Sequence, residues 1–449
     1  MIVSFLLLFI AVALIVFLTG QLQWHPFLVL ILVSIGFGLA SGMAPDMVLT
    51  TLQKGFGDTL GSIGIIIVVG LIIGTFFEKS GGAIVIANLF VRLLGSKRMH
   101  TAIAFMGYLI SIPVYADSGF VILTPINKAL TKKVGLSLAG TAVALGIGLT
   151  ASHTMVPPTP GPLAAAAIIG ADLGWVIVIG LVASILGLLV CIRFSKYMGE
   201  KIWIESDSAS PTDEENTTEQ LPSLTKTILP IFTPLLLIVI RAVIEYPGFP
   251  LADGNLKSFI AFIGHPITAL LIGMFLAFRM PVQKNAKRIS QGGWLGKAIQ
   301  GSATIILITA AGGAFGKMIQ ASGFHHAIEP LIKTLPLGLL LPFLMAALIK
   351  TAQGSSTVAL VTAASIVFPL LEALALTSTI DKALVVIAIG AGSAVVSHAN
   401  DSFFWVITQF SGMSVPQGYR LHSLATLVLG LTVISILLIF KGLLGLFAG

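Results

Sequence analysis

The sequence of residues 137–171 is SLAGTAVALGIGLTASHTMVPPTPGPLAAAAIIGA. Two apolar segments, 137–151 and 162–171, flank a proline-rich break at 152–162. Each segment is too short to cross about 30 Å of hydrocarbon at about 1.5 Å per residue. Prolines remove backbone donors and interrupt a helix. We therefore predict one broken membrane helix here, and not an ordinary loop between two spans.

The composition of the whole chain is that of a membrane protein. Of its 449 residues, 56% are hydrophobic and 10% are charged, whereas a soluble domain carries about 25% charged residues. The mean hydropathy is +1.03, and apolar runs of membrane-spanning length recur along the chain. We expect a polytopic all-α protein in the lipid bilayer, and we exclude a soluble enzyme and a nucleic-acid binder.

The net charge of +7 reflects membrane topology and does not indicate a polyanionic partner, because the basic residues fall between apolar runs. They gather at 79–98, 128–133, 193–201 and 279–297. Placing all four groups on the cytoplasmic side requires 101–131 to enter the membrane and return, as a re-entrant hairpin with its tip at Tyr115–Gly119. The segments 246–257 and 375–382 are then periplasmic.

The two halves of the chain resemble each other. The matching pairs are His25-Pro26 with His265-Pro266, Gly70 with Gly312, Gly74 with Gly316, Ser80-Gly81 with Ser322-Gly323, and Ser152-His153 with Ser397-His398. We predict an N-terminal repeat at 1–199, a flexible acidic cytoplasmic linker at 200–223 and a C-terminal repeat at 224–449. Each repeat has five crossings, one of them a broken helix, plus a re-entrant hairpin. Because five is odd, the second repeat is inverted, as in secondary transporters.

Four breaks carry the polar residues: the hairpin tip near Tyr115, the break at 152–162, the second hairpin at 350–357, and 397–402. Non-helical backbone at membrane depth is tolerated where it is buried in protein or lines a cavity, and helix N-termini bind anions. The predicted substrate-binding residues are Asp117, Ser118, Gly119, Ser152, His153, Thr154, Thr159, Gly161, Gln353, Gly354, Ser355, Ser356, Thr357, His398 and Asn400. No arginine falls in a break, so backbone amides and hydroxyls are expected to hold the anion.

Of the acidic residues outside the linker, Asp117 and Asp401 lie at the breaks, and both are candidates for proton coupling. A carboxylate in a dehydrated pocket is costly when ionised, so it can load a proton. Helix capping is the alternative role for either residue. His153 and His398 are further proton-coupling candidates, with buried structural histidines as the alternative. Lys350 is either a counter-ion or a side chain that snorkels to the interface.

At these residues the chain resembles the gluconate:proton symporter (GntP-type) permease family. The matching motifs are VPPTPGP at 156–162, ADLG at 171–174, GSST at 354–357 and SHANDSFFW at 397–405, in the same order as in the family. Many relatives read PPHPGP where this chain has Thr159. The resemblance implies proton-coupled uptake of gluconate or a related sugar acid, membership of the ion-transporter superfamily with its elevator mechanism, and a homodimer.

Other functions stay open at this point. Carbonyl and hydroxyl groups at the breaks suit sodium as well, so a sodium-coupled carrier of carboxylates or hydroxy amino acids is the nearest alternative. An anion channel is more distant, since nothing resembles a repeated selectivity filter. An intramembrane enzyme is the weakest candidate, because the sequence contains no protease signature. We expect no cofactor and no metal, and a location in the bacterial inner membrane.

Overall fold

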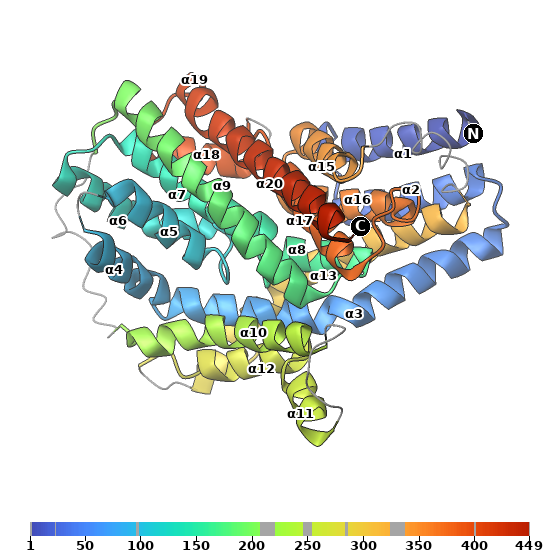
Figure 1. Cartoon of the computed structure of the whole chain (residues 1–449), viewed down its shortest axis with the longest axis horizontal. Helices are drawn as coiled ribbons and strands as arrows, with labels where there is room; N and C mark the ends of the chain where they lie inside the picture. The colour runs from blue at the N-terminus through green and yellow to red at the C-terminus, as the bar shows by residue number, and fades with distance from the viewer. Residues whose placement is uncertain are drawn as a thin grey trace.

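The computed structural model describes residues 2–22, 24–95, 98–206, 221–245, 254–282, 286–323, 337–398 and 401–448. All regular secondary structure in these residues is helical (Figure 1). The first half contains α1 (Ile2–Gly20), α2 (Pro26–Ala40), α3 (Pro45–Lys79), α4 (Gly82–Leu94), α5 (Met99–Ile110), α6 (Ala116–Val134), α7 (Leu138–Met155), α8 (Pro160–Ile169) and α9 (Leu173–Lys201).

The second half follows after residues 207–220, which lie outside the described part of the chain. It contains α10 (Leu224–Ile244), α11 (Asn255–Ile263), α12 (Pro266–Ala277), α13 (Trp294–Ala321), α15 (Leu340–Gln353), α16 (Ser356–Val367), α17 (Thr379–Ala394), α18 (Ser402–Phe410), α19 (Val415–Gly418), the π-helical segment Tyr419–Ser423 and α20 (Leu424–Ala448). Short 3₁₀ helices lie at Ala286–Ile289 and Phe368–Leu370.

Among the described residues, five helical segments are long and apolar enough to cross a membrane, or seven if each of two bent pairs counts as one span. The bent pairs are the two parts of α3, at 42°, and α11 with α12, at 60°. The segment Leu138–Ile169 comprises α7 and α8. In its most apolar 18-residue stretch 94% is buried inside the protein, whereas the corresponding share in the other four segments is 44–50%. This broken helix therefore runs through the protein interior, and the others present a face to lipid.

Equivalent helices of the two halves begin and end alike. His25 caps α2 and His265 caps α12, and in each case the ring Nδ1 accepts the backbone N–H two residues on. A proline follows at the first helical position, where a missing N–H costs nothing. The ends of α3 and α13 are each followed by a glycine with positive φ, Gly81 and Gly323.

Contacts between helices also match between the two halves, with α5, α7 and α9 corresponding to α15, α17 and α20. Helix α3 packs against α13, α5 against α7 and α15 against α17, and α7 against α9 and α17 against α20. Across the halves, α8 packs against α16 and α6 against α18. In Figure 1, α9 and α20 run beside each other across the front of the molecule. Each of these contacts in one half therefore has a counterpart in the other.

Several of these contacts bring backbone against backbone at glycine. A Cβ on Gly74 of α3 would lie 1.9 Å from the carbonyl oxygen of Pro113, in the break between α5 and α6. A Cβ on Gly148 of α7 would lie 2.0 Å from the carbonyl oxygen of Ala104. Side chains at these positions are excluded, and the breaks are fixed against neighbouring helices.

Two predictions about connecting segments are wrong. The basic segment 79–98, read from the sequence as a connection between apolar runs, contains α4, because Ala83, Ile86 and Ala87 form a buried face at helical spacing. The predicted linker 200–223 begins with structured residues: α9 extends to Lys201, and 202–206 pack on the first half. There Leu138 N–H bonds the Ile204 carbonyl at 2.9 Å.

Candidate functional site

Two of the four breaks between helices, those at 156–159 and 354–355, are shorter than the sequence indicates, and the other two begin earlier than predicted. The four breaks comprise 111–115, 156–159, 354–355 and 395–401. In the second of these, Pro160 and Pro162 lie in the first turn of α8, where a backbone N–H has no intrahelical partner. Helix α7 therefore continues to Met155, and His153 lies in its last turn.

Three of the four breaks meet at one cavity of about 280 Å³. Its lining residues are Tyr115, Ala116, Asp117, Thr150, His153, Thr154, Lys350, Gly354, Ser355, Ser356, Thr357, Ala394, Ser397, Asp401, Ser402 and Phe403. Ala116, Ser356 and Ser402 are the first residues of α6, α16 and α18. Three helix N-termini, with their partial positive charge, therefore border the cavity. Within this lining there is no arginine.

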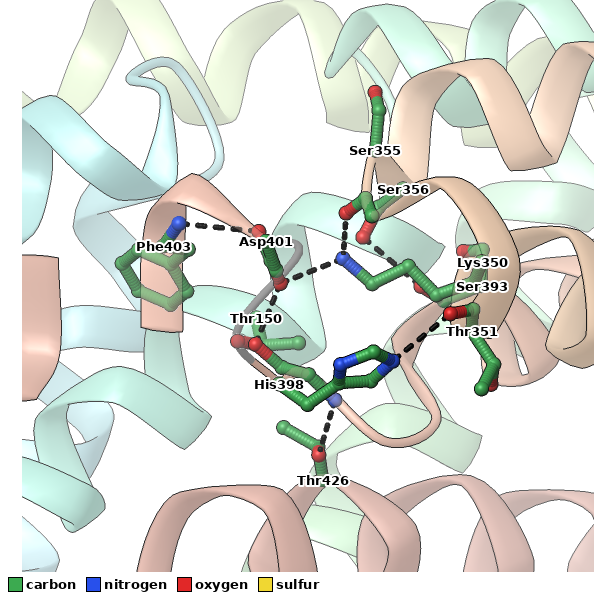
Figure 2. A network of polar contacts seen from close by, with 12 residues as sticks. Thr150, Lys350, Thr351, Ser355, Ser356, Ser393, His398, Asp401, Phe403 and Thr426 are labelled. Carbon is green, nitrogen blue, oxygen red and sulfur yellow. Dashed lines mark hydrogen bonds and ion pairs between the residues drawn. The ribbon is translucent and has the colours of Figure 1, made fainter. Parts of the chain in front are cut away.

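A buried ion pair forms one wall of the cavity (Figure 2). Lys350 Nζ donates to Asp401 Oδ2 at 2.6 Å, and the two side chains are 2% and 9% exposed. Lys350 also donates to the Gly354 carbonyl. Lys350 therefore acts as a counter-ion inside the protein and does not snorkel to an interface.

Asp401 accepts two further hydrogen bonds. Ser397 Oγ donates to Oδ2 at 2.5 Å, and the Phe403 N–H donates to Oδ1 at 3.0 Å. The second bond makes Asp401 the N-cap of α18. Capping and pairing with Lys350 coexist in this residue, so the capping alternative is confirmed without excluding a role in the cavity.

Asp117 lies in the first turn of α6 and is exposed to the cavity. Tyr115 occupies the N-cap position of this helix, and no side chain caps it. The alternative role of Asp117 as an N-cap is therefore wrong. Its carboxylate forms a hydrogen bond with Ser402. The cavity thus holds two carboxylates and one ammonium group.

The two predicted histidines lie in different environments. His153 lines the cavity, with its ring 5.9 Å from that of Tyr115 and tilted by 55°. Among the described residues, its Nδ1 has no hydrogen-bond partner. His398 forms a 2.8 Å hydrogen bond between Nε2 and the Thr351 carbonyl (Figure 2), and it is not among the cavity lining residues. His398 therefore holds the 395–401 break against the end of α15.

Hydroxyl groups line the cavity from α16, as the sequence predicts. Ser355 Oγ accepts the Val358 N–H at 3.3 Å and caps the helix. Ser356 Oγ donates to the Ser393 carbonyl at 2.9 Å, which ties α16 to α17. Thr357, Thr154 and the unpredicted Thr150 also line the cavity. This composition suits a ligand with both a carboxylate and hydroxyl groups.

Other predicted site residues do not line the cavity, because they are needed for close helix contacts. A Cβ on Gly119 would lie 2.7 Å from Leu149 Cδ2, and one on Gly161 would lie 2.5 Å from Leu360 Cδ1. Ser118, which follows Asp117 in the first turn of α6, is likewise not among the lining residues.

Ser152 and Thr159 are buried near the cavity without lining it. Thr159 Oγ1 donates to the Val156 carbonyl at 2.6 Å and so stabilises the break before α8. Ser152 Oγ has no hydrogen-bond partner in the described chain. Asn400 and the side chain of Gln353 lie outside the described residues.

Tyr115 and Phe403 line the cavity without having been predicted as site residues, and His422 was not predicted at all. Phe403 follows Asp401 in a motif that was singled out, so its position was readable. His422 lies in a segment with no glycine or proline among its five residues, and nothing in the sequence marks it as buried in the protein.

Comparisons with known proteins identify the family of this chain. The model of the family described as "GntP family permease" matches residues 3–443. The chain is 34% identical over 419 residues to the gluconate permease of Pseudomonas aeruginosa, with 91% of each chain covered. It is 31% identical over 443 residues to the Gnt-II system L-idonate transporter of Escherichia coli, with 97% of each covered.

The fold is similar to that in the crystal structure of the Alcanivorax borkumensis YdaH transporter, described as having an unusual topology. The TM-score is 0.68 at 15% identity, and the match covers 94% of this chain and 99% of the other. The resemblance read from the motifs is confirmed by the family match. The chain therefore belongs to the GntP family of permeases, which are multi-pass membrane transporters and not enzymes.

Proposed function

We propose that this permease imports gluconate or a related small sugar acid or hydroxy acid by proton symport across the bacterial inner membrane. The names of the gluconate and L-idonate relatives support the substrate class. The cavity of about 280 Å³ is just smaller than the roughly 300–1,000 Å³ typical of small-molecule sites, which suits a small substrate. Its hydroxyl groups and helix N-termini suit a hydroxylated carboxylate.

The charge of the cavity carries the proposal of proton coupling. Lys350 and Asp401 neutralise each other, whereas Asp117 faces the same cavity without a cation of its own in the described chain. An ionised Asp117 would repel an incoming anion across this small cavity. A proton on Asp117 removes that repulsion, so proton binding and anion binding favour each other.

The architecture supports an elevator mechanism between two inverted repeats at 1–199 and 224–449. Several helix contacts recur in both halves, among them those of α5 with α7 and of α15 with α17, and the cavity lies where breaks from both halves meet. Inverted repeats with discontinuous helices at the binding site are typical of secondary transporters. In this proposal α5–α6 and α15–α16 are the re-entrant hairpins, the segment between Ser206 and α10 is the linker, and the protein works as a homodimer.

Substitution of Asp117 by Asn tests the coupling. In proteoliposomes, Asp117→Asn should strongly reduce accumulation of labelled D-gluconate driven by a pH gradient, while gluconate exchange between the two sides continues in part. Asp46→Asn, an exposed acid at the start of α3, is the matched control. Accumulation by Asp117→Asn with unchanged pH dependence would exclude Asp117 as the coupling residue.

The same assay addresses the nearest alternative. The purified protein is supplied with an inward sodium gradient at equal pH on both sides, and then with a pH gradient in the absence of sodium. Uptake against a gradient only in the first condition would contradict proton symport and favour a sodium-coupled carrier. Gluconate flux down its own gradient, without exchange of labelled for unlabelled gluconate across the membrane, would indicate a channel.

A further inference from the structure

His422 is a buried histidine behind the substrate cavity. It is 0% exposed, and neither ring nitrogen has a hydrogen-bond partner among the described residues. It lies in the π-helical segment Tyr419–Ser423, which precedes α20. Segments of π-helix are rare and occur frequently at functional sites. An imidazole with two unpaired nitrogens is costly to bury, so a purely structural role leaves this residue unexplained.

The surroundings of His422 connect it to the ion pair in the cavity. Its ring meets that of Phe403 edge-on, at 5.7 Å and 83°. Phe403 lines the cavity, and its backbone N–H bonds Asp401 Oδ1. Ser423 Oγ, from the residue after His422, donates to the Ser397 carbonyl, and Ser397 Oγ donates to Asp401. The histidine and the carboxylate are thus held in fixed relation.

Few charged groups act on this imidazole. Asp401, at the start of α18, and Lys350 are the charges that influence it from neighbouring elements. Helix α7 places the uncharged Gly146 against the ring: a Cβ added to Gly146 would lie 3.7 Å from His422 Nδ1. The titratable residue of α7 is His153, in the last turn of that helix. On α9, Cys191 bonds the Ala425 carbonyl. The other titratable groups on the adjoining α9, α19, α20 and the segment itself are exposed or half-buried: Arg193, Lys196, Tyr197, Glu200, Lys201, Tyr419, Arg420 and Lys441.

We propose that His422 takes up a proton when the carboxylate of the substrate draws Lys350 away from Asp401. This inference rests on the proposed function, because it requires an anionic substrate in the cavity. Removing one member of a buried ion pair leaves an uncompensated charge, which is strongly unfavourable. His422 can supply the replacement cation, since both of its nitrogens are free to carry hydrogen.

The charges balance at each stage. In the empty site Lys350 pairs with Asp401, and His422 is neutral. In the loaded site the substrate carboxylate pairs with Lys350, and a proton from the side of entry converts the His422 imidazole to imidazolium, whose charge compensates Asp401. The proton leaves when Lys350 returns to Asp401. His422 is then a second protonation site beside Asp117, and Asp117→Asn retains residual proton coupling.

Histidine-selective nitrogen NMR of the full-length protein in nanodiscs tests this directly. The His422 signal is identified by its loss in His422→Gln. At pH 7 the wild type should show neutral imidazole at this position, and Lys350→Gln should show imidazolium for more than half of the molecules. In Lys350→Gln/Asp401→Asn, which removes both charges, the signal should return to the neutral form. Exposed His25 should not respond.

A titration of wild-type protein with D-gluconate gives a second measurement that needs no variant. Conversion of the His422 signal to imidazolium at saturation supports the proposal, even if Lys350→Gln does not fold. Imidazolium in Lys350→Gln without any gluconate response supports the link between His422 and Asp401, and counts against gluconate as the substrate. A neutral His422 in both experiments overturns the proposal, including the case in which Asp401 takes the proton instead.

Discussion

Replacement of Lys350 by Met should lower the free energy of unfolding by about 3–5 kcal/mol, the range observed when one partner of a buried ion pair is removed. Asp401 would keep its bonds from Ser397 and Phe403, which places Lys350→Met toward the lower end. In Asp401→Asn, Lys350 would keep the hydrogen bond to the Gly354 carbonyl but lose its carboxylate partner, which places this variant toward the upper end of the range.

The double variant Lys350→Met/Asp401→Asn separates the energy of the interaction between the two side chains from the cost of removing each side chain alone. Because it leaves no unpaired charge, its loss of stability should fall short of the sum of the single losses by about 2–3 kcal/mol. Reversible unfolding in mixed micelles, followed by tryptophan fluorescence, measures all four free energies. A shortfall of this size corresponds to a change of more than tenfold in the unfolding equilibrium constant, since about 1.4 kcal/mol is tenfold.

The chain contains a matched control pair. Arg241 Nε and Glu245 Oε2 are 3.0 Å apart on α10, with side chains 28% and 38% exposed. Removing either should cost less than about 1 kcal/mol, as for other exposed pairs. If Lys350 and Asp401 give equally small and additive losses, their pairing does not stabilise the fold, and the reasoning about charge in the cavity fails with it.

Two further predictions concern helix contacts and topology. Gly74→Ala should abolish folding or sharply reduce the yield of folded protein, because its Cβ would lie 1.9 Å from the Pro113 carbonyl oxygen. Gly57→Ala, on the same helix with open space around it, should be tolerated, and equal yields of the two variants would contradict the contact. Membrane-impermeant thiol reagents applied to intact cells should label Asn255→Cys, in the predicted periplasmic segment, and leave Ser290→Cys unlabelled. The reverse pattern would invert the topology.

The breaks were the predictable part of the site. Prolines at 157–162 and the Gly-Ser run at 354–357 disrupt a helix through backbone geometry, which depends on local sequence. Their lengths were overestimated, because prolines in a first helical turn look like breakers although they fit there. The same limit applies to α4, in which Arg92 and nearby basic residues obscured an apolar helical face.

Contacts between distant segments could not be predicted from local patterns. Lys350 and Asp401 are 51 residues apart, and the sequence left open whether the lysine side chain turned inward or toward the interface. The burial of His422 likewise depends on Phe403 and Gly146 in other helices. Gly161 illustrates the converse error: it looked suited to ligand approach, and its small size serves the contact with Leu360.

The bond between Lys350 and Asp401 means that the empty site already contains a carboxylate. Any external acid that approaches this ammonium group competes with one tethered to the same protein. A short tether gives an effective concentration on the order of millimolar or above. Because of this internal competitor, the apparent affinity for substrate equals the intrinsic affinity multiplied by the fraction of time that Lys350 is free. It also displaces the cargo once the site opens to the other side, so weak retention and rapid unloading follow from the same ion pair.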